Sequence, residues 1–184
     1  MDSNETWDLV PLPTGKKAIS CGWVYKTKRH ADGSVERLKA RLVAKGYSQR
    51  PGFDFTEVFA PTCRQPTIRM FLAIAAVEDL ELRTVDISSA FLNGNLEEDI
   101  YMKQTPGFET HPGLVCKLKK SLYGLKQGAR QWNKKLHSVL TSLGFKRLHS
   151  DHSVYIYVKG DTRILLPVWV DDITAVSKSK EFLD

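Results

Sequence analysis

Two adjacent aspartates lie between segments that need burial, and this feature constrains the fold more than any other in the chain. Residues 168–170 (Val-Trp-Val) precede Asp171 and Asp172, and a β-rich run, 173–176, follows them. Because unpaired buried charges are costly, we expect the pair at the tip of a hairpin formed by the flanking segments. The alternative is an ordinary surface turn, and the pair alone does not exclude it.

A third aspartate ends another apolar segment. Asp86 closes the predicted strand 80–87 and precedes a run, 87–91, that is too apolar for a solvent loop. If strand ends bring Asp86 beside Asp171 and Asp172, the carboxylates raise one another's pKa unless a cation neutralises them. Such oxygen ligands suit Mg²⁺, and two such ions catalyse in-line displacement at phosphorus. The sequence therefore predicts a site for two Mg²⁺ ions, with Mn²⁺ as the alternative metal.

The remaining pattern predicts an α+β domain, with an antiparallel sheet and packed helices. Apolar residues at helical spacing predict helices at 67–77 and 129–143, and Gly144 is the expected end of the second. Residues 7–13 are predicted to be an extended lead-in. Alternating or β-branched runs predict further strands at 20–29, 35–44, 153–158 and 163–170. The Asp32-Gly33 turn signal between the first two predicts that they form a β-hairpin.

The composition is that of a globular intracellular protein, with 184 residues, 42% hydrophobic and 26% charged. No stretch reaches the roughly 20 apolar residues of a membrane span. The polar N-terminus is not a secretory signal. Cys21, Cys63 and Cys116 form no even framework, so buried, reduced thiols are expected. We therefore predict a protein that is neither membrane-bound nor secreted.

The net charge of +6 hides an uneven distribution along the chain. Residues 1–50 carry ten basic and five acidic side chains, and residues 110–150 carry nine basic ones without Asp or Glu. Between them, residues 51–109 hold ten acidic and four basic side chains. Basic blocks favour a polyanionic partner, most commonly nucleic acid. Charge alone does not separate that reading from a solvated surface.

The segments that carry these residues resemble copia-type retrotransposon reverse transcriptases. TVDISSAFLNGNL at 84–96 resembles the first catalytic motif of the family, and WVDD at 169–172 resembles its catalytic hairpin. Further segments match in the order of the family: 7–47, 59–61, 67–76, 99–108 and 118–132. The resemblance covers nearly the whole chain.

The resemblance implies the fingers–palm part of a right-hand polymerase, with fingers over about 1–65 and palm over 66–184, without thumb or ribonuclease H domain. It implies an RNA-directed DNA polymerase that adds dNTPs to a primer on an RNA or DNA template. Implied partners are the other polyprotein domains, ribonuclease H and integrase, in cytoplasmic virus-like particles or the nucleus. Because the chain stops twelve residues after Asp172, the alternative is a truncated or repurposed remnant that binds nucleic acid without catalysis.

The resemblance also assigns roles to the acidic residues and to one aromatic residue. Asp86, Asp171 and Asp172 are the implied catalytic and metal-binding residues, the first two as ligands and the third as their support. Phe91, five residues after Asp86, stands where the family has an aromatic gate that excludes the ribose 2′-hydroxyl. A plain core phenylalanine is the alternative. Gln127 is expected to contact the sugar or triphosphate of the nucleotide.

Basic residues complete the predicted site. Lys39 and Arg41, on the second predicted fingers strand, are candidates for binding the triphosphate through charge-assisted hydrogen bonds. Ordinary surface charges are the alternative for both. Lys126, Arg130 and Trp169 are the predicted nucleic-acid contacts, and Trp169 stands where the family usually has tyrosine.

Overall fold

The computed structural model describes residues 5–183 and divides into two compact units, each made of two separate stretches of chain. Unit 1 comprises the described residues up to Val58 together with 91–132, and unit 2 comprises 59–90 together with 133–183. The strands and the two α-helices of residues 5–183 confirm the predicted α+β class. The units interleave in sequence, and a division into fingers and palm near residue 65 stays a prediction.

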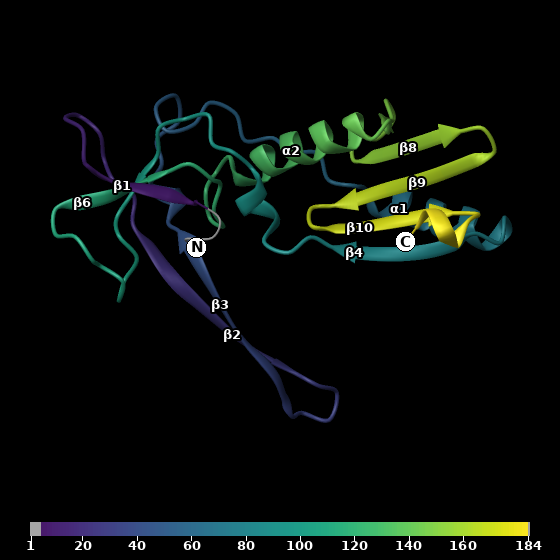
Figure 1. Cartoon of the computed structure of the whole chain (residues 1–184), viewed down its shortest axis with the longest axis horizontal. Helices are drawn as coiled ribbons and strands as arrows, with labels where there is room; N and C mark the ends of the chain where they lie inside the picture. The colour runs from purple at the N-terminus through teal and green to yellow at the C-terminus, as the bar shows by residue number, and fades with distance from the viewer. Residues whose placement is uncertain (1–4, 184) are drawn as a thin grey trace. The chain divides into compact units, whose positions relative to one another are not determined.

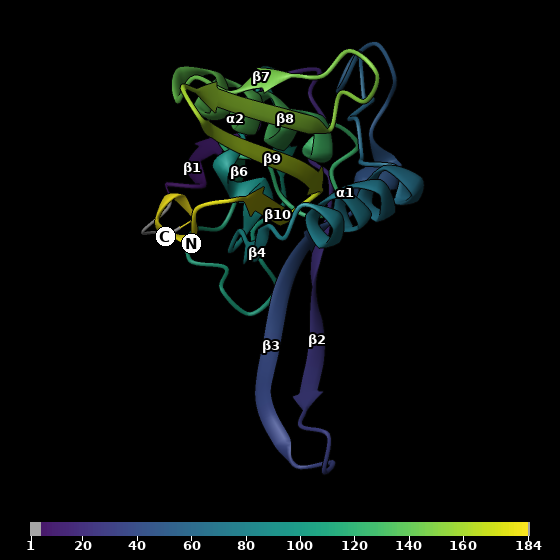
Figure 2. The ribbon, with the colours of Figure 1, turned by 90° about the vertical axis from the view of Figure 1, so that its right-hand side faces the viewer.

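Unit 1 holds a three-stranded antiparallel sheet and a separate hairpin. The sheet has the order β1 (Trp7–Pro11), β6 (Leu114–Leu118), β5 (Tyr101–Met102). The hairpin is formed by β2 (Cys21–Arg29) and β3 (Val35–Ala44), which run side by side to the turn between them in Figures 1 and 2. The hairpin confirms the prediction from the Asp-Gly turn, whereas the predicted lead-in is a paired strand, β1.

The core of unit 1 joins its sheet to the base of the hairpin. Ile19 and Leu42, from the hairpin side, and Met102, Cys116 and Leu122 are all at most 5% exposed and form one cluster. Burying apolar side chains of this size stabilises a fold by about 1.5–3 kcal/mol each. The base of the hairpin is therefore anchored by packing.

Unit 2 is built on a five-stranded antiparallel sheet. Its order is β4 (Glu81–Asp86), β10 (Asp172–Ser177), β9 (Thr162–Trp169), β8 (Val154–Lys159) and β7 (Lys146–Arg147). Helix α1 (Gln65–Val77) contributes Phe71 and Ala75 to a buried cluster with residues of β8, β9 and β10, and it lies behind the sheet in Figure 1. The β9–β10 hairpin confirms the prediction from the two adjacent aspartates.

Helix α2 (Gly128–Ser142) ends as predicted before Gly144, whose φ of +90° suits a glycine after a helix. Its first residues belong to unit 1 and residues 133–142 to unit 2. None of the helices within residues 5–183 is long and apolar enough to cross a membrane.

The three cysteines are buried and unpaired among the described residues, as the sequence predicted. Burial raises the pKa of Cys63 to about 11, and the carboxylate of Asp151 adds to the rise. Burial likewise raises the pKa of Cys116 to about 11. Because the thiolate is the reactive form, both side chains act as small core residues.

A carboxylate from a distant loop is hydrogen-bonded to residues at the start of helix α1. Within the described residues, Arg64 at the N-cap position gives the helix no side-chain hydrogen bond. Asp151 instead accepts hydrogen bonds from the Thr67 hydroxyl at 2.9 Å, the Arg64 amide at 3.4 Å and the Ser153 amide at 3.0 Å. Burial raises the pKa of Asp151, but these hydrogen bonds outweigh it and lower the pKa below its ordinary value of 3.8.

We predict that Asp151→Ala lowers the free energy of unfolding by about 1 kcal/mol at pH 7, the usual net contribution of a hydrogen bond. Because the pKa of Asp151 is lowered in the folded state, its contribution is fully present above pH 3.8 and disappears as the pH falls through the folded-state value. Urea unfolding at pH 7 and near pH 3 measures this, with the exposed Asp161→Ala as the control. Equal stability of the two variants at pH 7 would contradict a stabilising role of the Asp151 hydrogen bonds.

Candidate active site

In unit 2, two of the predicted carboxylates face each other across neighbouring strands. Asp86, the last residue of β4, is the register partner of Asp172, the first residue of β10. Directly opposed residues of antiparallel strands project from the same face of a sheet, with Cβ atoms about 5 Å apart. Both residues are exposed. Solvent and a ligand therefore have access to a pair of carboxylates at one end of the sheet.

Asp171 lies in the tight turn that joins β9 to β10. Trp169 pairs with Asp172, so Val170 and Asp171 form a two-residue connection. Val170 has a φ of 58°, which is strained for a β-branched side chain. The Ile87 amide donates to the Asp171 carbonyl oxygen at 3.1 Å, which attaches the chain after Asp86 to the turn. Strain of this kind is concentrated at functional sites.

Asp86 and Asp172 have the oxygen ligands that a hard cation prefers. Asp171 does not complete a preformed three-residue metal site with them. Within residues 5–183, no group of three or more His, Cys, Asp or Glu side chains could hold a metal ion. Mg²⁺, however, is usually bound through one or two carboxylates, with water and substrate phosphates completing its six ligands. Asp86 and Asp172 suit that mode of binding. Direct ligation by Asp171 stays a prediction.

In unit 1, the β2–β3 hairpin separates its charges from its apolar side chains. Lys26 pairs with Lys39 and Lys28 with Arg37, while Arg41 lies opposite Val24. Paired residues share a face, and faces alternate along each strand. We call the face that carries Lys26, Lys28, Arg37, Lys39 and Arg41 the cationic face.

The opposite face of the hairpin is apolar and aromatic. Trp23 pairs with Leu42 and Tyr25 with Ala40. The Trp23 and Tyr25 rings stack, with centroids 6.5 Å apart. The two predicted triphosphate ligands, Lys39 and Arg41, thus lie together on the face that is suited to phosphate.

Two predicted site residues, Arg41 and Phe91, contact the same tyrosine. The Arg41 guanidinium carbon lies 5.6 Å from the centroid of the Tyr123 ring. Phe91 meets that ring edge to face, with centroids 4.6 Å apart and an interplanar angle of 83°. Sequence reasoning did not find Tyr123, because an aromatic residue in a loop carries no pattern that separates a site from a core. The structure brings the predicted sugar gate and a predicted phosphate ligand together.

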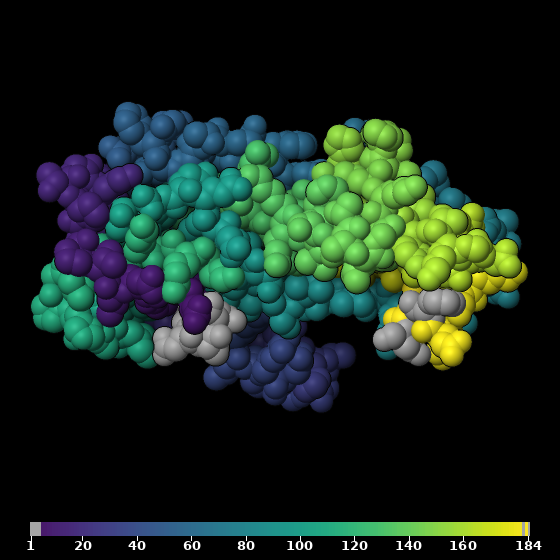
Figure 3. Space-filling view, turned by 45° about the horizontal axis from the view of Figure 1, so that its top comes forward, coloured from purple at the N-terminus to yellow at the C-terminus, as the bar shows by residue number. Residues whose placement is uncertain are grey.

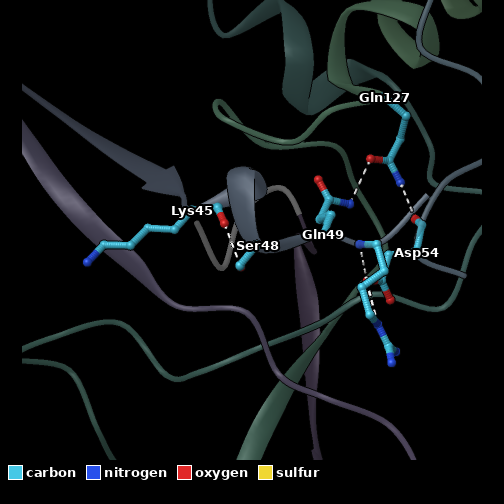
Figure 4. A network of polar contacts seen from close by, with 6 residues as sticks. Lys45, Ser48, Gln49, Asp54 and Gln127 are labelled. Atoms are coloured by element: carbon cyan, nitrogen blue, oxygen red, sulfur yellow. Dashed lines mark hydrogen bonds and ion pairs between the residues drawn. The ribbon is translucent and has the colours of Figure 1, made fainter.

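Gln127 is the centre of a buried polar network (Figure 4). Its Oε1 accepts from Gln49 Nε2 at 3.0 Å, and its Nε2 donates to the Asp54 carbonyl at 3.0 Å and to Glu98 Oε2 at 3.2 Å. Gln49 Oε1 accepts from the Lys126 amide at 2.8 Å. The amide of Gln127 is occupied by protein partners here, and its contact with a nucleotide stays a prediction. Gln49 is a further residue that sequence reasoning missed.

The sequence profile described as "Reverse transcriptase (RNA-dependent DNA polymerase)" matches residues 4–184. The chain belongs to this family. It is 45% identical over 173 residues to the retrovirus-related Pol polyprotein from transposon RE1 of Arabidopsis thaliana, covering 92% of this chain and 12% of the relative. It is also 45% identical over 183 residues to that from transposon TNT 1-94 of Nicotiana tabacum, covering 98% and 14%.

These relatives confirm the resemblance to copia-type retrotransposon reverse transcriptases. A putative transposon Ty5-1 protein of Saccharomyces cerevisiae is 37% identical over 102 residues, or 54% of this chain and 33% of the relative. The chain spans about one eighth of the two plant polyproteins, 12% and 14% of their lengths. No solved structure matches it.

The three predicted nucleic-acid contacts of this reverse transcriptase domain lie in different surroundings. Trp169 ends β9 as the register partner of Asp172, and it is 39% exposed. Lys126 has an exposed side chain just before α2, and Arg130 is half-buried in the first turns of that helix. These positions leave their predicted roles untested.

Close backbone packing in unit 1 brings the segment around Gly46 against the segment around Gly124. A Cβ on Gly124 would lie 2.1 Å from the Ala44 carbonyl oxygen, and one on Gly46 would lie 2.0 Å from the Gly124 carbonyl oxygen. The Ala44 amide donates to the Tyr123 carbonyl at 2.8 Å. This approach lets Gln49 reach Gln127. Residues of the loop from 46 to 58 form part of the molecular surface, in blue along the top of Figure 3.

We predict that Gly124→Ala destabilises unit 1 far more than Gly52→Ala. Both glycines have positive φ, +89° and +78°, so each substitution costs about 1–2 kcal/mol for the backbone. A Cβ on Gly52 meets no described atom within 4 Å, whereas one on Gly124 collides with backbone and adds about 1–3 kcal/mol. Urea unfolding of both variants measures the difference. Equal losses of stability would show that the close packing does not exist.

Proposed function

We propose that this chain performs RNA-directed DNA polymerisation, adding dNTPs to a primer on an RNA or DNA template by two-metal nucleotidyl transfer. Family membership over residues 4–184 supports the reaction class. The observation that carries the proposal is the register of Asp86 against Asp172, beside the strained turn that holds Asp171. Two adjacent, solvent-accessible carboxylates can bind a divalent cation through their oxygens, as two-metal nucleotidyl transfer requires.

In the proposed reaction, Asp86, Asp171 and Asp172 hold two Mg²⁺ ions, or Mn²⁺ in their place. When bound, the ions lower the pKa of the attacking primer hydroxyl and stabilise the leaving pyrophosphate. The exposure of the carboxylates leaves room for water and phosphate oxygens. The hydrogen bond from Ile87 to the turn keeps Asp171 at the end of the sheet beside the Asp86–Asp172 pair.

The nucleotide is proposed to be selected by residues of unit 1. Arg41 and Lys39, on the cationic face, bind the triphosphate through charge-assisted hydrogen bonds. The Phe91 ring abuts the 2′ position of the sugar and excludes ribonucleotides by steric clash. Gln127 contacts the sugar or triphosphate after exchanging a bond of its network. These roles rest on the resemblance of the segments that carry these residues to those of the family.

The primer–template is the proposed macromolecular partner. The rest of the cationic face, together with Lys126 and Arg130, is proposed to contact the phosphates of the primer–template. Such contacts need positive charge and do not depend on the base sequence. Trp169, at the hairpin that carries the aspartates, presents a flat ring to the primer. In a longer polyprotein, ribonuclease H and integrase domains are the proposed neighbours, since the relatives are named as Pol polyproteins.

A second candidate is a remnant that binds nucleic acid without catalysis. One observation favours it: within residues 5–183, the three aspartates do not form a group that could hold a metal. The cationic face would bind nucleic acid in either case, so only an assay of bond formation separates the two candidates.

We predict that this chain extends a primer in the presence of Mg²⁺. Asp171→Asn and Asp86→Asn should each lower the rate of extension at least about 100-fold. Loss of a residue that supports a metal ligand already lowers activity by up to about 100-fold, and loss of a ligand itself should cost at least as much. Asp161→Asn, at the tip of the β8–β9 hairpin, is the matched control and should keep full activity. Incorporation measured on a labelled primer decides the question. Equal extension by all variants would remove the site, and no extension by the unsubstituted chain would favour the remnant.

We also predict that binding of a labelled primer–template weakens steeply with salt, and that Lys26, Lys28 and Arg37 contribute to the slope. Changing all three to Gln should lower the slope of log K against log salt by about 2–3, because each lost phosphate contact removes about 0.7–0.9. Fluorescence anisotropy across a NaCl series measures it. The control changes exposed lysines of unit 2, Lys159, Lys178 and Lys180, to Gln. An equal effect of both sets would mean that the cationic face has no special role.

A further inference from the structure

Tyr123 is the only aromatic ring for which contacts with both a proposed phosphate ligand and the proposed sugar gate are seen in the described part of the chain. The Arg41 guanidinium lies within the roughly 6 Å over which a cation is attracted to a ring face. The Phe91 edge meets the same ring nearly perpendicularly, an arrangement that aromatic pairs prefer. Both contacts depend on orientation as well as distance, so they fix how the three side chains lie.

The backbone on both sides of Tyr123 is held in place. Its carbonyl accepts the Ala44 amide at 2.8 Å, and Gly124, which follows it, packs against the Ala44 carbonyl. Before it, Ser121 and Leu122 are buried, at 0% and 1% exposed. The ring therefore stands on a rigid part of unit 1.

Arg41 and Phe91 are anchored less completely than Tyr123. Arg41 sits in the hairpin with its backbone in register with Val24, but its long side chain has many rotamers. Phe91 begins a short turn closed by the bond from the Gly94 amide to its carbonyl, at 3.0 Å. For both, contact with the fixed Tyr123 ring limits the side-chain conformations.

We propose that Tyr123 is a positioning residue for the incoming nucleotide, whose ring holds the Arg41 guanidinium and the Phe91 gate in a fixed relation. The inference rests on the proposed polymerase function and deepens it. Triphosphate binding by Arg41 and sugar selection by Phe91 then both depend on the Tyr123 ring. Removing the ring loosens both, whereas removing only the hydroxyl leaves both intact.

The test measures kcat and KM for single-nucleotide incorporation of dATP and ATP by the chain and its variants. Tyr123→Leu is expected to raise the KM for dATP about three- to tenfold and to lower the preference for dATP over ATP about three- to tenfold, the range that contacts of these two kinds are worth. Tyr123→Phe keeps the ring and should stay within about twofold of the unsubstituted chain in both quantities.

Two further variants keep the test decisive. Tyr123→Met fills much of the same volume without a ring, and it serves if Tyr123→Leu does not fold. Tyr25→Leu removes another stacked tyrosine of unit 1 and is the matched control, with unchanged KM and sugar preference. Adding Tyr123→Leu to Phe91→Ala should change sugar preference little further, because residues that act together are non-additive.

The outcomes separate this inference from the proposed function. If ring-free variants melt at a lower temperature but keep the KM and the sugar preference, Tyr123 is a packing residue and the inference is overturned. Full additivity with Phe91→Ala in sugar preference overturns it too. If the unsubstituted chain incorporates no nucleotide, the proposed polymerase function is overturned, and the inference about Tyr123, which rests on it, is overturned as well.

Discussion

The backbone contact between Ala44–Gly46 and Tyr123–Gly124 is the constraint on which the candidate nucleotide site of unit 1 depends. Only glycine fits where a Cβ would lie about 2 Å from a carbonyl oxygen, at 2.0 and 2.1 Å here. That approach places Gln49 against Gln127 and sets Tyr123 beneath Arg41 and Phe91. Each of these polar and aromatic contacts is worth little by itself, but a fixed backbone spares them much of the entropy of ordering.

In unit 2, by contrast, the neighbouring carboxylates repel each other electrostatically. Asp86 and Asp172 repel each other across β4 and β10, and the sheet holds them together because its register is determined by apolar partners such as Ile173 and Val176, which are 7% and 0% exposed. A one-residue slip would turn those buried side chains outward. Packing therefore holds two like charges next to each other, which is the arrangement that the proposed metal site requires.

Local patterns made much of this fold predictable. The β2–β3 hairpin follows from its Asp-Gly turn, and the β9–β10 hairpin from charged residues between apolar runs. The sequence also predicted that Asp86 lies near the β9–β10 hairpin. That its register partner is Asp172 depends on the pairing of β4 with β10, which no local sequence signal encodes. The pairing of β1 with β6 and the Gln49–Gln127 bond join residues about 80 to 110 positions apart. Such contacts depend on tertiary packing and leave no periodicity in the sequence.

The interleaving of the two units has a consequence for how such a chain can be divided. Unit 1 takes residues from both sides of the 59–90 stretch, and unit 2 takes residues from both sides of the 91–132 stretch. A single break in the polypeptide therefore cannot leave both units complete, because any cut that leaves one unit whole divides the other. Gene fusion, recombination or proteolysis at one point would leave at least one core incomplete.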